Sequence, residues 1–166
     1  EYGLEKAEEW ATGLVSNLAR RPQGNDRAQV KGIYEGLCDV AIINNYYFGK
    51  LKYSEDPIQR EWAKSMRLTF PNQEEGDRGA HINISGGGVA KYSKNKQFAV
   101  RLLEFLSSSE SQKMYSEINF EYPVNIKVSP SEELVSWGDF REDKISIEKI
   151  AQLSIDAQKI IDRVGW

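Results

Sequence analysis

The stretch Cys38-Asp-Val-Ala-Ile-Ile-Asn-Asn-Tyr-Tyr-Phe-Gly-Lys50 is an apolar run that ends in two asparagines and two adjacent tyrosines. Its centre, Val40 to Ile43, is short, rich in β-branched residues and bounded by polar ones, which is typical of a strand buried on both faces. Tyr46 and Tyr47 follow just past the carboxyl end of this predicted strand. In open α/β sheets, ligands bind outside the carboxyl ends of strands, so the two tyrosines are candidate ligand contacts.

Because the two tyrosines are adjacent, only some backbone conformations let them act together. On a continuing strand, neighbouring side chains point to opposite faces. We therefore expect the pair in a turn or in the first turn of a helix, where neighbours diverge by about 100°. Phenols have an ordinary pKa of about 10, so they bind as phenolates at neutral pH only when a hard, highly charged metal ion displaces the proton. The alternative is a pair of packing aromatics whose hydroxyls bond to the backbone.

Length and composition limit the possible functions. The 166 residues carry 22 Lys and Arg against 25 Asp and Glu, with a formal net charge of −3. This length fits one domain or parts of two, and the absence of a basic excess argues against a nucleic-acid partner. No apolar run approaches the roughly 20 residues of a membrane span. Cys38 is the only cysteine and His81 the only histidine, so metal chemistry within this chain must use oxygen ligands.

Helical periodicity recurs along the chain and predicts helices that begin near residues 4, 26, 48, 57, 94, 109 and 146. Capping boxes at Asp26 with Gln29, and at Ser109 with Gln112, mark two of these starts. Short apolar runs predict strands over residues 40–43, 66–70 and 80–85. The order of helix, tight turn and strand favours an α/β fold with a mostly parallel sheet. We expect residues 127–144 to be mostly irregular.

Other candidate sites have weaker support. The run Gly86-Gly-Gly88 lacks the Lys and Ser/Thr of a P-loop, and it predicts a tight turn or a hinge. His81 has no catalytic partner in a recognisable motif, and no Gly-x-Ser-x-Gly elbow occurs, so we expect it to have a hydrogen-bonded structural role. The acidic pairs Glu74-Glu75 and Glu132-Glu133 lie in polar stretches that are typical of solvated loops.

The segment Ile42-Ile-Asn-Asn-Tyr-Tyr-Phe-Gly49 resembles the ferric-iron-binding proteins of bacterial ABC importers, which are periplasmic solute-binding proteins. Further stretches agree with this family in order along the chain: Arg20-Arg-Pro-Gln-Gly-Asn-Asp-Arg27, Phe70-Pro-Asn-Gln73, Gly79-Ala-His-Ile-Asn-Ile-Ser-Gly86, Phe120-Glu-Tyr-Pro-Val124 and Asp162-Arg-Val-Gly-Trp166. The resemblance is to the subgroup whose iron site is rich in tyrosines. It implies an α/β, periplasmic binding protein type II-like two-lobe fold, of which this chain is the carboxy-terminal portion.

The resemblance also implies a function and its residues. Tyr46 and Tyr47 match the family's tyrosine pair, which supplies two phenolate ligands to Fe3+, with or without an accompanying anion. Asn25 and Asn44 fall near positions that in relatives help to hold the tyrosines or the anion. Such a protein catalyses no reaction. It captures ferric iron in the periplasm and delivers it to an ABC transporter permease, which is its only link to the membrane.

Part of the family's pattern has no counterpart in this chain. The ligands of the amino-terminal lobe, and a further tyrosine upstream of the pair, are absent, so we expect half a site that a missing amino-terminal segment of the same protein completes. By the same resemblance, residues 1–73 are part of the carboxy-terminal lobe and carry the tyrosine pair. Residues 74–166 form a hinge crossing and a return segment whose carboxy-terminal helices pack on the amino-terminal lobe.

Three alternatives remain open on the sequence. The first is a binding protein of the same fold for a small anion, in which the tyrosines stack or donate hydrogen bonds. The second is a hydrolase that uses His81 as its base. The third is a ligand-free piece with structural meaning only.

Overall fold

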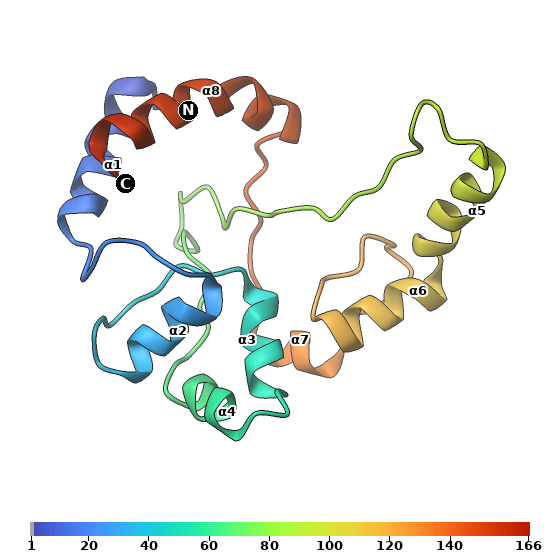
Figure 1. Cartoon of the computed structure of the whole chain (residues 1–166), viewed down its shortest axis with the longest axis horizontal. Coiled ribbons are helices and arrows are strands. Elements are labelled where there is room, and N and C mark those ends of the chain that lie inside the picture. Colours follow the sequence, from blue (N-terminus) through green and yellow to red (C-terminus); the bar gives the residue numbers. More distant parts are fainter. Residues whose placement is uncertain (1) are drawn as a thin grey trace. The chain divides into compact units, whose positions relative to one another are not determined.

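The computed structural model describes residues 2–166 and is built from helices joined by extended segments (Figure 1). The elements in chain order are α1 (Leu4–Ser16), α2 (Asp26–Tyr34), α3 (Asn45–Lys52), α4 (Pro57–Lys64), α5 (Lys96–Leu106), α6 (Ser109–Met114), the π-helix η1 (Tyr115–Asn119), α7 (Glu132–Ser136) and α8 (Ile147–Val164). The predicted helices are thereby confirmed. Within residues 2–166, none of the helices is long and apolar enough to cross a membrane.

The chain divides into two compact units, which are described separately. The first unit consists of Glu1–Ala41 and Lys144–Trp166, and the second of Ile42–Asp143. The predicted division at residue 73 concerns the lobes of a longer parent protein, and it stays a prediction.

In the first unit, the first and last helices of the chain pack against each other. Ala11 of α1 and Ile160 of α8 are buried, and an ion pair joins Glu8 to Arg163. The rings of Trp10 and Trp166 lie 6.1 Å apart between centroids. Helices from the two ends of the sequence are thus held together by a small apolar contact and by one ion pair, whose residues are 155 positions apart.

Helix α2, also in the first unit, has its N-cap one residue earlier than predicted. Asn25 is the N-cap, and its side-chain oxygen accepts a hydrogen bond from the Ala28 amide at 3.2 Å. The Gln29 side chain donates back to the Asn25 carbonyl at 3.2 Å. Asp26 therefore lies in the first turn rather than at the cap. An asparagine serves as a cap as well as an aspartate does, which is why the sequence pattern was ambiguous by one position.

In the second unit, α3 packs on α4 and on η1. The centre of this packing is formed by Leu51 of α3, Leu134 of α7 and Phe120, all of which are buried. Asp56 caps α4 through a 2.8 Å bond from the Ile58 amide, with Pro57 in the first turn, as predicted. Helix α6 is capped by Ser108 rather than by the predicted Ser109.

The polar loop over residues 71–79 is fastened to residues 141–143. The Gln73 side chain accepts from the Arg141 amide at 2.6 Å and donates to the Arg141 carbonyl at 3.1 Å. A parallel bridge then joins Ala80 to Glu142, with bonds from the Ala80 amide to Arg141 at 2.8 Å and from the Asp143 amide to Ala80 at 2.7 Å. The two segments therefore run side by side in the same direction for a short distance.

The predicted strands are wrong as paired elements within this chain. Among residues 2–166, the Ala80–Glu142 bridge is the only β pairing, and residues 40–43, 66–70 and 81–85 are extended without a partner strand. Val40 is 80% and Ile42 is 72% exposed, although the sequence predicted burial on both faces. A strand becomes buried only when neighbouring strands and covering helices are present, and the described residues do not supply them here.

The tight turn expected at the glycine run needs correction. Residues 86–88 lie in an extended segment and not in a turn, and none of these three glycines has a positive φ. Residues 127–144 are mostly irregular, as predicted, apart from the five-residue helix α7. The π-helix that follows α6 was also not predicted; it ends at Phe120, whose backbone is left-handed with φ 59°.

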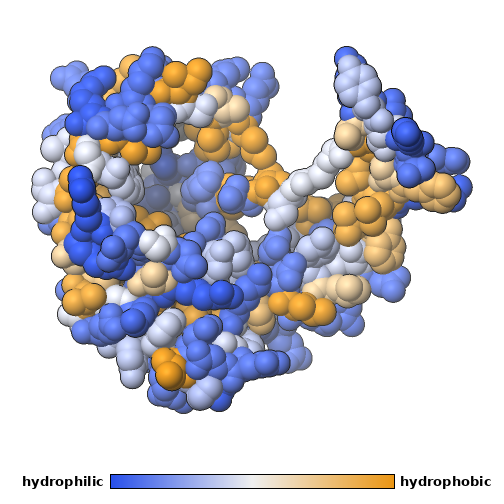
Figure 2. All heavy atoms as spheres, viewed as in Figure 1, coloured by the Kyte–Doolittle hydropathy of each residue, from blue (hydrophilic) through white to orange (hydrophobic). Residues whose placement is uncertain are grey.

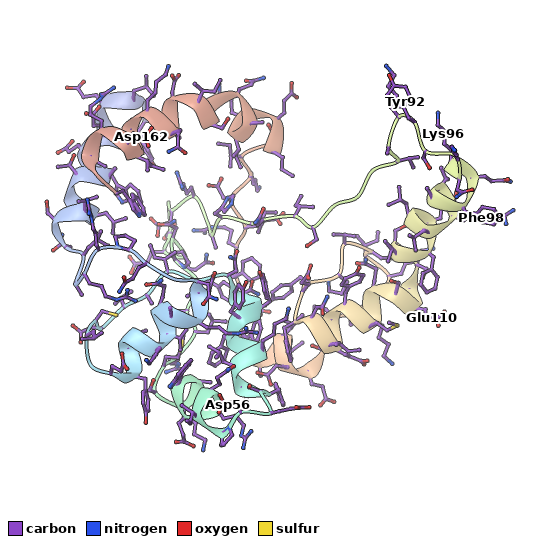
Figure 3. The ribbon with its side chains drawn as sticks, in the orientation of Figure 1. Asp56, Tyr92, Lys96, Phe98, Glu110 and Asp162 are labelled. Atoms are coloured by element: carbon purple, nitrogen blue, oxygen red, sulfur yellow. The ribbon has the colours of Figure 1, made fainter. Side chains whose placement is uncertain are left out.

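Helix α5 has apolar side chains on two faces. Leu103 contacts the extended segment, since a Cβ on Gly87 would lie 2.9 Å from its Cδ2 atom. Phe98, Leu102 and Phe105 follow the i, i+4, i+7 spacing of another face and are exposed, Phe98 by 66%. Figure 2 shows apolar residues at the surface around α5 and α6, and Phe98 projects outward in Figure 3.

Candidate metal centre

Tyr46 and Tyr47 lie in the first turn of α3, which confirms the predicted backbone setting of the pair. Asn44 is the N-cap of this helix, and its carbonyl accepts the Tyr47 amide at 3.1 Å. Both tyrosine side chains are half-buried. Their ring centroids are 4.3 Å apart, and the ring planes are inclined by 32°. The helical backbone therefore brings two phenols together, as a strand would not.

Positive charge lies beside the Tyr46 ring and at the start of α3. The Lys50 ammonium lies over the Tyr46 ring, 4.9 Å from its centroid, because residues four apart share one face of a helix. The first turn of α3 contains no acidic residue. The partial positive charge of the helix start is therefore not neutralised by a neighbouring carboxylate of that turn.

Two phenols offer hard oxygen donors, which suit a hard cation such as Fe3+. Within residues 2–166, no group of three or more His, Cys, Asp and Glu side chains is arranged to hold a metal ion. The tyrosine pair is the candidate metal centre of these residues. Two donors fill part of a metal's coordination shell, and the rest must come from other groups.

Helix α3 is fixed in its unit by aromatic rings on one side. Gly49 is buried against Phe120, and a Cβ on Gly49 would lie only 2.4 Å from the Phe120 ring. The Phe120 ring stacks on Tyr53 with centroids 5.5 Å apart and planes inclined by 11°. Phe48 meets Trp137 edge to face, with centroids 5.9 Å apart. Glycine at residue 49 is what allows this close approach.

The end of α3 remote from the tyrosines is bound by Glu133 of α7, which sequence reasoning assigned to a solvated loop. Lys52 Nζ donates to both oxygens of this carboxylate, at 2.7 and 2.8 Å. The Tyr53 hydroxyl donates to one of them at 2.7 Å, and Trp137 Nε1 donates to the other at 2.9 Å. The Glu133 side chain is only 12% exposed. Ser131 is the N-cap of α7 and is followed by two acidic residues, a helix-start signal that could have revealed this helix. No local sequence signal could have revealed the partners of Glu133.

The electrostatics of this cluster are mutually supportive. Burial raises the pKa of the Glu133 carboxyl, but hydrogen bonds from Lys52, Tyr53 and Trp137 outweigh burial and hold that pKa below its ordinary value. The hydrogen bond to Glu133 raises the pKa of Lys52 and, together with burial, that of Tyr53. At neutral pH, Glu133 is thus favoured as the carboxylate, Lys52 as the ammonium and Tyr53 as the neutral phenol.

The structure places the remaining predicted residues elsewhere. Asn25 belongs to the first unit, where it caps α2, whereas the tyrosine pair and Asn44 belong to the second. His81 is exposed, and the structure shows no hydrogen bond from its side chain to another of residues 2–166. The expected structural role of His81 is therefore wrong. Among residues 2–166, the His81 side chain also has no hydrogen bond or ion pair to an acid or base that would support a hydrolytic role.

The architecture matches about half of each of several solved ferric-binding proteins. Ferric ion-binding protein A of Mannheimia haemolytica, solved in an open conformation, matches with a TM-score of 0.90 and 46% identity, over 99% of this chain and 50% of that chain. A Trichodesmium protein solved in complex with iron and citrate matches with a TM-score of 0.91 and 44% identity, over 99% of this chain and 52% of that one. The type II-like fold prediction is confirmed.

The sequence relatives agree with the structural ones. Iron uptake protein A1 of Synechocystis is 42% identical over 164 residues, which are 99% of this chain and 45% of that protein. The major ferric iron-binding protein of Neisseria meningitidis is 28% identical over 163 residues. The chain spans about half the length of the curated relatives it matches. No protein-family model matches the chain. The predicted resemblance to ferric-iron-binding proteins is confirmed.

Proposed function

We propose that the protein containing this chain binds ferric iron through the phenolates of Tyr46 and Tyr47 and delivers it to an ABC permease. The observation that supports this most directly is the close pairing of the two phenols, with ring centroids 4.3 Å apart, at the start of α3. The relatives over nearly the whole chain are iron uptake and ferric iron-binding proteins. The periplasm is the proposed compartment, because a Serratia marcescens relative is named a Fe(3+)-binding periplasmic protein.

Binding would proceed by replacement of protons by the metal. Fe3+ displaces the protons of both phenols, and the two oxygens coordinate it from one side. Asn44, at the N-cap, holds the first turn of α3 through the bond from the Tyr47 amide. The other ligands would come from a carried anion or from the amino-terminal segment proposed to complete the site. Residues 1–73 are proposed as part of the carboxy-terminal lobe, and residues 74–166 as a hinge crossing and return segment whose carboxy-terminal helices pack on the amino-terminal lobe.

A carried anion fits the charges at the site. Lys50 and the start of α3 contribute positive charge next to the phenols, and the Trichodesmium relative was solved with iron and citrate. We therefore propose that this half of the site accepts Fe3+ as its complex with citrate or a similar multidentate carboxylate. Asn25 stays a proposed contact for such an anion.

Competition titrations test this proposal. Ferric citrate is titrated into the wild-type chain and into Tyr46→Phe, Tyr47→Phe and the double variant, with a stronger chelator as competitor. We expect the double variant to lose more than the roughly 10- to 100-fold that removal of an outer partner costs. Tyr92→Phe is the control, because Tyr92 is an exposed tyrosine of the same unit, outside α3 (Figure 3). Unchanged affinity in the double variant would refute the role of the pair.

The anion-binding alternative has its own test. Calorimetry with metal-free citrate, phosphate and sulfate, compared with ferric citrate, separates the two functions. A binding protein for anions would take the metal-free ligands as tightly as the iron complex, and it would do so in the double Phe variant as well. The hydrolase alternative has less support, since the relatives are named for iron binding and uptake and His81 has no catalytic partner beside it.

A further inference from the structure

We infer that Glu133 is a positioning residue for the tyrosine pair: it clamps the far end of α3 so that the first turn presents both phenols together. This inference rests on the proposed function of the pair. All of the groups involved belong to the second unit and lie on α3, on α7 or at the end of η1.

The clamp acts on the two residues that end α3. Lys52 is the last residue of the helix and Tyr53 is its C-cap, and both donate to the same carboxylate at 2.7 Å. Trp137 Nε1 donates to it as well, at 2.9 Å. Several donors converging on one nearly buried carboxylate fix its rotamer, and a fixed carboxylate in turn fixes the residues that it binds.

Glu133 is itself held in place. Ser131, the N-cap of α7, donates its amide to the Ser116 hydroxyl at 2.7 Å and its own hydroxyl to the Ser116 carbonyl at 3.0 Å. Leu134, next to Glu133, is completely buried. The α7 backbone is therefore anchored to η1, and Glu133 transfers that anchorage to α3.

Helix α3 is short enough to transmit the constraint. From Tyr46 to Lys52 the helix rises about 9 Å at about 1.5 Å per residue, and a helix of two turns tilts as one body. The aromatic contacts of Gly49 and Tyr53 with Phe120 limit translation of α3. The Glu133 contacts limit its tilt, because they act at the end opposite the tyrosines. Binding sites need their groups held within about 0.5 Å of the productive geometry.

The test compares Glu133→Gln with two control variants. Glu133→Gln keeps the size of the side chain but only one acceptor oxygen, whereas Tyr53 and Trp137 donate to different oxygens of Glu133. It also loses the charge that pairs with Lys52. Glu117→Gln removes an exposed ion pair to Lys113 in the same unit. Ser108→Ala removes the cap of α6, which lowers stability without a contact to α3. Each variant is measured for ferric citrate affinity and, free of metal, for nuclear Overhauser contacts between the Tyr46 and Tyr47 ring protons.

We expect Glu133→Gln to lower ferric citrate affinity about tenfold and to weaken the ring-to-ring contacts in the metal-free chain. Glu117→Gln and Ser108→Ala should retain both. Lys52→Met should shift both readouts in the same direction, and adding it to Glu133→Gln should have little further effect, because coupled residues are non-additive.

The inference is overturned if Glu133→Gln keeps the ring contacts at wild-type strength, or if Ser108→Ala lowers the affinity as much as Glu133→Gln does. The second result would mean that any loss of stability has this effect. If the protein that contains the chain does not bind ferric citrate, the proposed function fails. The ring contacts of the metal-free variants then still decide whether Glu133 positions the pair.

Discussion

Gly49 is the residue at which α3 comes closest to the rest of its unit. The Phe120 ring lies where a Cβ would be, and Phe120 is buried with a left-handed backbone, so it has little room to move. Any side chain at residue 49 must push either the ring or the helix. A shift of the helix would move the turn that carries Tyr46 and Tyr47.

Gly49→Ala should therefore lower the free energy of unfolding by about 1–3 kcal/mol, as overpacking does, and it should weaken ferric citrate binding. Gly13→Ala is the matched control, because Gly13 lies inside α1 with nothing within 4 Å of its Cβ position. That variant should gain about 0.5–1 kcal/mol from the better helix propensity of alanine. Urea unfolding measures both, and a neutral Gly49→Ala would contradict the packing described here.

Asn25 has a structural role that the sequence did not assign. Its side chain caps α2, so Asn25→Ala should cost about 0.5–2 kcal/mol and Asn25→Ser should restore most of that loss. Hydrogen exchange of the α2 amides measures the cap. If Asn25 also contacts the carried anion, Asn25→Ser should restore stability and leave ferric citrate affinity reduced. Full recovery of affinity in Asn25→Ser would limit Asn25 to capping.

At the scale of elements, the contact between α3 and α7 should depend on pH. The folded pKa of Glu133 lies below its ordinary value, so its contribution to stability is complete above the unfolded carboxyl pKa of about 4.5. That contribution is lost as pH falls through the folded pKa. Lys52 has a raised pKa, so its contribution is complete below its unfolded pKa and is lost as pH rises through the folded one.

The difference in unfolding free energy between wild type and Glu133→Gln measures this dependence. We expect a plateau through neutral pH and a decline on the acid side, where the carboxylate takes up a proton. A difference that grows as the solution is acidified would have the wrong sign for a carboxyl with a lowered pKa. For Glu117→Gln, which removes an exposed ion pair, the difference in unfolding free energy from wild type should be close to zero at every pH.

The helices could be predicted from the sequence because their signals are local. Asp56-Pro57 and Ser146 mark helix starts that the structure confirms. The strands could not be predicted as paired elements, because pairing depends on partners distant in the sequence or outside this chain. Val40 has strand character, but nothing in the local pattern shows whether neighbours cover it. Helix α7 was missed for a different reason: with five residues, it is too short to show periodicity.

The candidate site shows the same division. The pairing of Tyr46 with Tyr47 was predictable, since adjacent side chains can act together only in a turn or at a helix start. The clamp by Glu133 was not, because it joins residues 81 positions apart. Phe120 was equally hidden, since its position beside Gly49 depends on a π-helix that ends in a left-handed residue.

At the scale of the whole molecule, the exposed apolar face of α5 should make the isolated chain associate. Phe98, Leu102 and Phe105 form a contiguous set at helical spacing, and such faces are covered in stable proteins. Phe98→Lys should lower the association seen by sedimentation as concentration rises. Ile126→Lys is the control, because Ile126 is exposed outside any helix. A wild-type chain that stays monomeric at high concentration would contradict this prediction.

Acid should release iron from the intact site. Protons compete with Fe3+ for the phenolate oxygens, so affinity should fall as pH falls. Measurement of retained iron after dialysis at successively lower pH checks this expectation. Affinity that does not change with pH would indicate ligands other than phenolates.

Lys50→Gln should weaken the binding of ferric citrate more than that of ferric ion with a neutral chelator, because Lys50 contributes positive charge beside Tyr46.

The most direct test of the central claim is the visible absorption of the chain with ferric citrate. Phenolate oxygens bound to Fe3+ give a charge-transfer band that neither free tyrosine nor ferric citrate shows. We predict that the wild-type chain develops this band, that each single change to Phe weakens it, and that Tyr46→Phe with Tyr47→Phe abolishes it. A band that persists in the double variant, or a wild-type chain that binds ferric citrate without one, would contradict coordination by this pair.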